Sequence, residues 1–399
     1  VNGRFSMELP YRHAEATYFP IGNGTFRIVN LRWNDEILSD SLLGNIRLTP
    51  DVVQIVNVNG TLAGGQLRGG IRYGLKTGSR GVYDLELRQV EASRLLLPLT
   101  SEAKHIKGAV DVNVHGGIAR DWDGSGGVTL VRGQIFGMDI TEWRLPVTFS
   151  FAPAQGSGEL TVRDSHARIA QGRARFDSTL YWGNGLRLAA TLLFYQVDLR
   201  TLFRNSPEVA AYVSGRVSGR IDMASSEMRS VNDLTAVVRA KMQQGQAMQL
   251  PVLRHIAPYL RPGTSSATFD SGELKGRLAH GIFRIERATL AGEFIKLLIL
   301  GTINVAGNLN LEVTAQTGLN ALSSANANNI STRIPLLGAI PRLILYEANS
   351  LLSLAVVHLR VTGTFHSPVV RLEPLLVMTE DAIRFFFNRA IGLDIPNLP

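Results

Sequence analysis

Acidic and hydroxyl side chains alternate in residues 121–127 (DWDGSGG), where Asp121, Asp123 and Ser125 imitate the start of a calcium-binding loop. Oxygen ligands recur at every second position of such loops, and the twelfth position supplies a bidentate Glu. Arg132 occupies that twelfth position here, and the flanking segments have the pattern of strands. The tip of a β-hairpin therefore explains the segment better, and calcium at Asp121 and Asp123 stays an open alternative.

A pair of carboxylates, Asp84 and Glu86, has the spacing of residues on one face of a strand, about 7 Å apart. Two acids at that distance could serve an inverting glycosidase. They alternate with Leu85 and Leu87, however, so a solvated strand face opposite an apolar one is the better interpretation.

Other catalytic and cofactor motifs are missing or incomplete. Residues 69–77 (GGIRYGLKT) approach a phosphate-binding loop, but Leu75 stands where the Lys belongs. The eight His are dispersed, and the chain contains no Cys, which excludes disulfides, zinc-thiolate sites and thiol catalysis. We expect no catalytic residue, no metal site and no cofactor, and therefore a protein that is not an enzyme.

The composition is that of a folded chain with a thinly charged surface. Apolar residues make up 45% and charged residues 19%, below the usual share of about 25%. A net charge of +8 favours anionic partners such as phospholipid headgroups or nucleic acid. Because the basic residues are scattered singly and form no basic helix or RNA-recognition strand, we expect no nucleic-acid partner.

Alternation of apolar and polar residues is the dominant pattern, and it must position any functional residue. Val110, Val112 and Val114 alternate with polar residues, and residues 309–313 repeat the pattern. A period of two gives strands with one apolar face. Turns are expected at Asn59-Gly60, Asp123-Gly124 and Asn184-Gly185, because such pairs accept positive φ. The prediction is a mainly β fold: an elongated, curled, mostly antiparallel sheet that forms a groove with an apolar interior, like a β-taco.

Helical periodicity is confined to a few segments. It predicts short amphipathic helices at residues 199–213, near 250–261 and near 335–350, and a C-terminal helix at 375–391, with a loop at 319–333. The apolar arc of the C-terminal helix is broad enough to cover either an end of the sheet or a membrane surface. No apolar run reaches the ~18 residues of a membrane-spanning helix.

Four segments in order resemble the C-terminal region of AsmA-like proteins, which are related to TamB and to bridge-like lipid-transport proteins of the bacterial envelope. The segments lie at residues 250–260 (LPVLRHIAPYL), 268–286 (TFDSGELKGRLAHGIFRIE), 301–311 (GTINVAGNLNL) and 361–374 (VTGTFHSPVVRLEP). The resemblance covers residues 240–375, about a third of the chain. It divides the chain into a repeated β-groove segment, 1–240, and an AsmA-like C-terminal region, 241–399.

This resemblance implies phospholipid transport between inner and outer membrane and a contribution to outer-membrane biogenesis. It also implies a periplasmic location and an N-terminal anchor in the inner membrane. Residue 1 is not Met and no signal sequence follows it, so we expect the chain to begin inside a longer protein. Expected partners are phospholipid, a membrane at one or both ends and an envelope protein.

The residues expected to line the groove are apolar positions of the alternating segments. They are Leu85, Leu87, Val110, Val112, Val114, Phe283, Ile285, Leu309, Leu311 and Val313. The aromatic residues Trp122, Trp143, Trp182 and Tyr181 fit either a headgroup interface or cross-strand packing. Two other functions stay open: a scaffold or assembly factor for outer-membrane proteins that pairs through sheet edges, and a β-solenoid polysaccharide hydrolase.

Overall fold

The computed structural model describes residues 2–8, 11–12, 21–33, 36–76, 78–97, 101–135, 137–205, 210, 213–228, 231–246, 255–256, 269–292, 295–317, 356–364 and 367–373. The chain forms two compact units. The first comprises Val1–Phe194 and Met223–Arg229, and the second comprises Tyr195–Asp222 and Ser230–Pro399. The boundary predicted between residues 240 and 241 falls instead within a strand of the second unit.

Strands make up most of both units. In the first unit they are β1 (Asn2–Glu8), β2 (Tyr11–Arg12), β3 (Ile21–Trp33), β4 (Glu36–Leu48), β5 (Val52–Leu62), β6 (Gly65–Gly74), β7 (Gly81–Glu91), β8 (Ile106–Ile118), β9 (Trp122–Ile135), β10 (Met138–Ala152), β11 (Ser157–Ile169), β12 (Gly172–Trp182) and β13 (Arg187–Asp198), whose last residues belong to the second unit. The second unit has β14 (Ser214–Ser225), whose last residues belong to the first unit, β15 (Thr235–Gln246), β16 (Phe269–Ala279), β17 (Ile282–Ala291), β18 (Ile295–Asn304), β19 (Asn308–Thr317), β20 (Val356–Thr364) and β21 (Pro368–Glu373).

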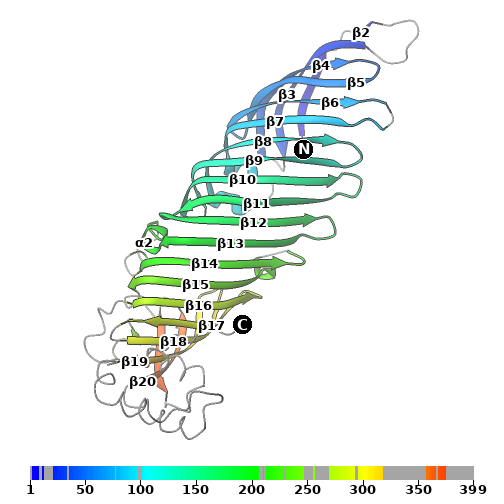
Figure 1. Ribbon diagram of the computed structural model, residues 1–399. Helices are drawn as coiled ribbons and strands as arrows, with labels where there is room; N and C mark the ends of the chain where they lie inside the picture. Colours follow the sequence, from blue (N-terminus) through cyan, green and yellow to red (C-terminus); the bar gives the residue numbers. More distant parts are fainter. Residues whose placement is uncertain are drawn as a thin grey trace. The chain divides into compact units, whose positions relative to one another are not determined.

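Neighbouring strands of the chain pair antiparallel, as the short connections between them require. Strands β3 to β12 form one such series and lie side by side in Figure 1, and β15 to β21 form another. The sheet is curled and open: within the described residues, β21 pairs with β20 alone. The predicted fold class, a mainly β protein with a curled antiparallel sheet, is confirmed.

Register gives the sheet of the first unit two different faces. One row of directly opposed residues crosses from β5 to β12 and consists of Ile55, Ile71, Tyr83, Gly116, Gly124, Phe149, Leu160 and Leu180. Side chains alternate between faces along a strand, so the residues beside this row point the other way. We call the side of this row the apolar face and the opposite side the polar face.

Bulges with left-handed residues recur along the strands. The register shifts at Gln89 (φ 54°) and at Asp164 (φ 58°). The backbone N–H of each bulge residue donates to a carboxylate on the next strand, Asp111 Oδ1 at 2.7 Å and Asp177 Oδ1 at 2.6 Å, respectively. Because bulges bend a strand and increase its twist, they account for part of the curl.

Two of the three predicted turns are wrong. Asn59-Gly60 lies within β5 and Asp123-Gly124 within β9. Both glycines leave room for a side chain of another strand, since a Cβ at Gly60 would collide with Leu42 and one at Gly124 with Tyr83 and Phe149. The third turn, Asn184-Gly185 between β12 and β13, is confirmed, with Gly185 at φ 93°.

Helices are few among the described residues. The helix α1 (Ala92–Leu96) and the 3-10 helix η1 (Ser101–His105) join β7 to β8, and the sequence pattern did not predict them. The helix α2 (Leu199–Leu202) forms the first part of the predicted 199–213; of residues 206–212 only 210 is described, in helical conformation. A second 3-10 helix, η2, spans Val231–Asp233.

The other predicted helices lie mainly outside the described residues. Of the helix near 250–261 only residues 255 and 256 are described, in helical conformation. The helices near 335–350 and at 375–391 and the loop at 319–333 lie outside. Within the described residues, no helix combines the length and hydropathy needed to cross a membrane.

Candidate functional site

Half of the predicted groove residues share the apolar face of the first unit. Leu85 lies directly opposite Val114, and Leu87 lies opposite Val112. These four side chains are half-buried. Val110 lies at the end of the same face and is only 7% exposed. The alternation in the sequence therefore places these residues together, and four of them keep surface that a ligand can reach.

The other half belongs to a buried cluster in the second unit. Ile285, Leu309, Leu311 and Val313 are at most 8% exposed, and Phe283 packs against them. Ile256 lies in the same cluster and is fully buried. These residues form a closed core in this structure, so a ligand can reach them only if the chain that buries them moves away.

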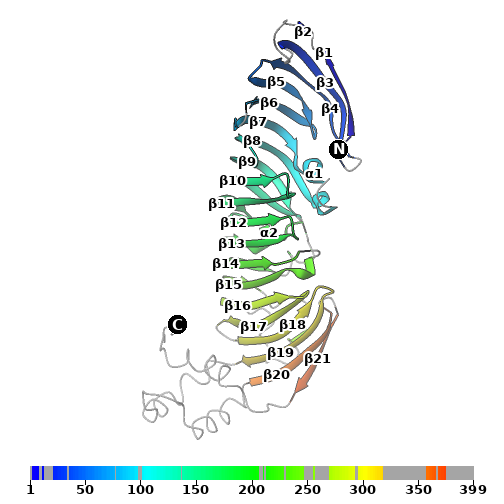
Figure 2. The same cartoon turned by 90° about the vertical axis from the view of Figure 1, so that its right-hand side faces the viewer.

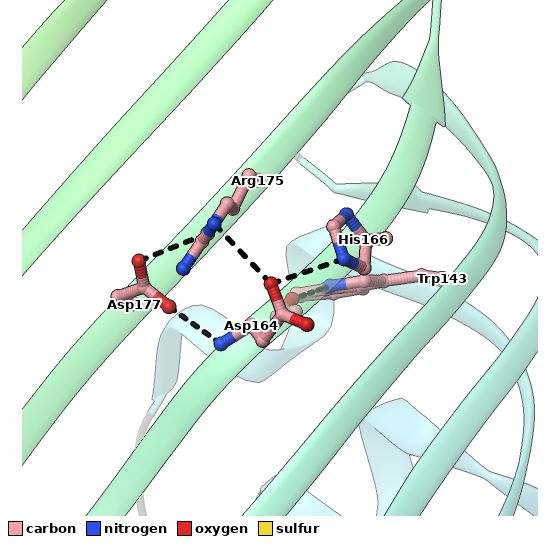
Figure 3. A network of polar contacts seen from close by, with 6 residues as sticks. Trp143, Asp164, His166, Arg175 and Asp177 are labelled. Carbon is pink, nitrogen blue, oxygen red and sulfur yellow. Dashed lines mark hydrogen bonds and ion pairs between the residues drawn. The ribbon is translucent and has the colours of Figure 1, made fainter.

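One end of the apolar face in the first unit is covered. The segment α1–η1 lies at the end of β7 and β8 (Figure 2) and contributes the buried Ala92 to a cluster with Val90, Val110 and Leu130. On the same face, the indole N–H of Trp143 donates to the hydroxyl of the fully buried Ser165 at 2.9 Å (Figure 3). The described residues at this end thus pack against the covering segment, and the Trp143 indole N–H has an acceptor.

The sequence contains a feature that indicates the position of α1. Alternation stops at Ala92, three Leu follow at 95–97, and Pro98 comes next. A helix usually ends before a Pro because the preceding residue is pushed out of the α conformation. The broken alternation followed by Pro98 therefore marks the covering segment.

The middle of the same sheet is hollowed. An open cavity of about 910 Å³ follows β5 to β10, and Ile55, Ile71, Tyr83 and Phe149 are among the residues that line it. All four belong to the apolar row. Asp84, His115 and Asp123, which alternate with the row, also line the cavity, so it is not lined by the apolar face alone.

Tyr83 is the one titratable group in this row. Its side chain is 9% exposed, and its hydroxyl donates to the backbone carbonyl of Asp123 at 3.1 Å. Burial raises the pKa of the Tyr83 hydroxyl above its ordinary value, and the negative charge of Asp123 adds to this shift. The phenol therefore stays neutral near pH 7, as an apolar surface requires.

Several residues of the apolar face were missing from the predicted set. Val128 lies opposite Val112, and Leu145, Val147 and Phe149 continue the face on β10. Residues 145–151 (LPVTFSF) alternate as regularly as any segment of the chain. The signal was therefore present in the sequence and the same reasoning could have found them.

The polar face carries ion pairs. At the bulge of Asp164, its carboxylate contacts His166 Nε2 at 3.2 Å and Arg175 Nη1 at 3.3 Å, and Asp177 contacts Arg175 Nε at 3.2 Å (Figure 3). All four side chains are partly or well exposed to solvent. Exposed pairs of this kind contribute roughly 0–1 kcal/mol each to folding stability. We therefore interpret the network as a modest support for the bulge and not as a reactive site.

The predicted carboxylate pair also lies on the polar face. Glu86 binds Arg88 Nη2 at 2.6 Å, and Asp84 is the register partner of His115. His115 Nε2 in turn lies 3.2 Å from the hydroxyl of Ser125. A serine beside an imidazole has the types needed for nucleophilic catalysis, but no hydrogen bond joins Asp84 to His115 in the described residues. Asp84, His115 and Ser125 form a cross-strand ladder of polar side chains on the polar face, which is solvated.

The calcium-like segment is part of a strand. Asp123 and Ser125 belong to β9, and the Asp123 carboxylate contacts Arg80 at 3.4 Å. Within the part of the chain that the structure describes, no three His, Asp or Glu side chains come close enough to share a metal ion. Arg80 is thus the counter-charge of Asp123.

Searches of protein-family models, of curated proteins and of solved structures found no match to this chain.

Proposed function

We propose that this chain shields the acyl chains of phospholipids on the apolar face of its first unit, as a non-enzymatic part of lipid transport between the inner and outer membrane. The observation that supports this is the row of apolar residues that runs from Ile55 to Leu180 across eight strands. An apolar row that crosses eight strands is longer than the pocket of an enzyme requires. It suits a ligand that moves along a surface.

The energetics of burial fit the same ligand. Each CH₂ group removed from water is worth about 0.8 kcal/mol, so even a partly covered acyl chain gains several kcal/mol. A phosphate headgroup would lose far more by burial without a partner. Acyl chains should therefore lie on the apolar face while headgroups remain at its margin.

The resemblance of residues 240–375 to AsmA-like proteins supports the same function and adds its cellular setting. It leads us to propose a periplasmic location, anchoring to the inner membrane and a contribution to outer-membrane biogenesis. Membranes at one or both ends and an envelope protein are the proposed partners.

Site-specific photo-crosslinking tests this proposal. Photoreactive residues at Leu85 and Val147 would lie on the apolar face, and matched ones at Asp84 and Thr148 would lie on the polar face of the same strands. We expect phospholipid adducts, identified by mass spectrometry, at Leu85 and Val147 only. Equal labelling of both faces, or no lipid at either, would contradict the proposal.

The edge strand β21 favours a second candidate, a scaffold or assembly factor that pairs with another protein. Val369 and Leu372 on this strand are 48% and 63% exposed. An exposed edge can add a strand of a partner. Protein adducts from a photoreactive residue at Leu372, together with no lipid adducts at Leu85, would favour this candidate.

A further inference from the structure

Three aromatic side chains form a strip at one end of the apolar face in the first unit. Trp122 is the register partner of Phe151, which lies opposite Gly158, and Gly158 lies opposite Trp182. The Trp122 and Phe151 rings meet edge to face with centroids 6.4 Å apart, and Phe151 stacks on Trp182 at 6.4 Å and 27°. We call Trp122, Phe151 and Trp182 the aromatic strip.

Gly158 makes the strip continuous. A Cβ at this position would collide with the ring of Trp182. Without that Cβ, the Trp182 indole lies over β11 and reaches the ring of Phe151. The glycine therefore has a local purpose: it lets rings from β10 and β12 meet across the strand between them.

The strip lies at the end of the strands opposite to the one covered by α1–η1. Trp122 is the first residue of β9 and Trp182 the last of β12, whereas Trp143 lies near the covered end. Trp143 donates its N–H to Ser165, but within the described residues the indole N–H groups of Trp122 and Trp182 have no protein acceptor. Trp122 is also 42% exposed. This end is therefore open and has two unused donors.

Cationic residues come from the same end of the strands as the strip. Arg120 precedes Trp122 in the turn between β8 and β9 and is exposed. Arg187 begins β13, and its guanidinium lies 5.3 Å from the ring centroid of Tyr181, which precedes Trp182 on β12 and therefore points to the polar face. An indole offers an apolar body and a polar N–H, which suits the boundary between acyl chains and ester or phosphate groups. A guanidinium group in the adjoining turn, as Arg120 supplies, suits the phosphate itself.

We propose that the aromatic strip binds a phospholipid molecule at the level of its glycerol esters, with the acyl chains on the apolar face and the phosphate toward Arg120 in the adjoining turn. This inference rests on the proposed function and specifies where and in which orientation the lipid enters. It also assigns different tasks to the tryptophans: Trp122 and Trp182 contact lipid, and Trp143 belongs to the covered end.

Fluorescence quenching by brominated phosphatidylcholine tests the orientation. The chain has four Trp, so the variant W33F/W143F retains only the indoles of the strip, and W33F/W122F/W182F retains only Trp143. Each protein is loaded from vesicles containing lipid brominated near the ester or near the methyl end, and is then separated from the vesicles. Mass spectrometry measures the bound lipid in the same samples. If a variant does not fold, the single variants W122F and W182F are used instead. The difference in quenching between each of them and the wild type then gives the contribution of the missing strip indole.

We expect the strip indoles to lose more fluorescence to bromine near the ester than to bromine near the methyl end, and Trp143 to show no such preference. Lipid bound without this preference would overturn the inference and leave the proposed function intact. If the quenching is lost when the vesicles are removed, although the protein still retains lipid, the strip contacts a membrane surface. That result would also overturn the inference. Absence of bound lipid from the wild type would overturn the proposed function itself.

Discussion

The hydroxyl of Tyr83 on β7 donates a hydrogen bond to the backbone carbonyl of Asp123 on β9, at 3.1 Å. The side chain crosses β8 to reach this carbonyl and lies over Gly116 and Gly124, where any Cβ would collide with it. One polar bond thus fixes an aromatic ring flat on the apolar face. The two glycines are necessary for that arrangement.

Replacing Gly124 with Ala should lower the free energy of unfolding by about 1–3 kcal/mol, the usual cost of overpacking. The new methyl group would collide with the Tyr83 hydroxyl and the Phe149 ring. Gly127→Ala is the matched control on the same strand, because its Cβ would approach only Asn113 Oδ1, at 3.3 Å, and the Leu145 carbonyl, at 3.8 Å. Urea denaturation of both variants checks the prediction, and equal losses would contradict it.

The raised pKa of Tyr83 predicts a stability difference at high pH. In the unfolded chain this phenol ionises near its ordinary pKa of about 10, and in the folded chain it ionises only at higher pH. Its contribution is therefore complete below about pH 10 and is lost as pH rises through the folded value. Compared with Tyr83→Phe, the wild type should lose stability as pH rises above about 10. Parallel denaturation curves for the two proteins across this range would be evidence against the shift.

The sequence predicted strands well because alternation is a local property. Val110, Val112 and Val114 share a face in any regular strand, and the structure has them so. The sequence pattern did not distinguish a glycine in a turn from a glycine packed beneath an aromatic ring. The ring above Gly124 comes from Tyr83, which lies on a strand that is distant in sequence. The turns at Asn59 and Asp123 were wrong for this reason.

The sequence also did not separate an open apolar face from a closed core. Leu85 and Leu311 have the same alternating surroundings, yet Leu85 is half-buried and Leu311 is 4% exposed. The difference comes from the residues that cover them: Ile256 lies in the cluster with Leu311. Such covering depends on tertiary packing, which a pattern within one strand does not contain.

A charge on the apolar face should reduce lipid binding without unfolding the sheet. Val147 is half-buried on β10, so Val147→Glu can keep its carboxylate hydrated while it makes the face unfavourable for acyl chains. Thr148→Glu places the same charge on the polar face of the same strand. We expect loss of co-purified phospholipid, measured by mass spectrometry, in Val147→Glu alone. Circular dichroism of both variants establishes that the sheet is intact, and equal lipid content in the two would refute the prediction.

Glu286 should stabilise the second unit in a pH-dependent way. Its carboxylate contacts Lys275 at 3.0 Å and Arg277 at 2.6 Å, and the hydrogen bond from Lys275 is the main cause of a lowered pKa. A carboxyl with a depressed folded pKa stabilises the fold above its unfolded pKa, about 4.3, and this is lost as pH falls through the folded value. The wild type should exceed Glu286→Gln in stability at pH 7, and the difference should shrink as pH falls below about 4.3. A difference that persists at low pH would rule out the ion pairs as its source.

Leu311 should act as a core residue rather than as a lipid contact. It lies in a closed cluster with Ile256, Val313 and Val361, so Leu311→Ala should lower the free energy of unfolding by about 2–5 kcal/mol. Leu372→Ala, at a 63% exposed position of the same unit, should change it by less than about 0.5 kcal/mol. Lipid content should be the same in the two variants, because the surface that we propose to bind acyl chains belongs to the first unit. Loss of lipid from Leu311→Ala with little loss of stability would show instead that the cluster opens and that the second unit carries lipid as well.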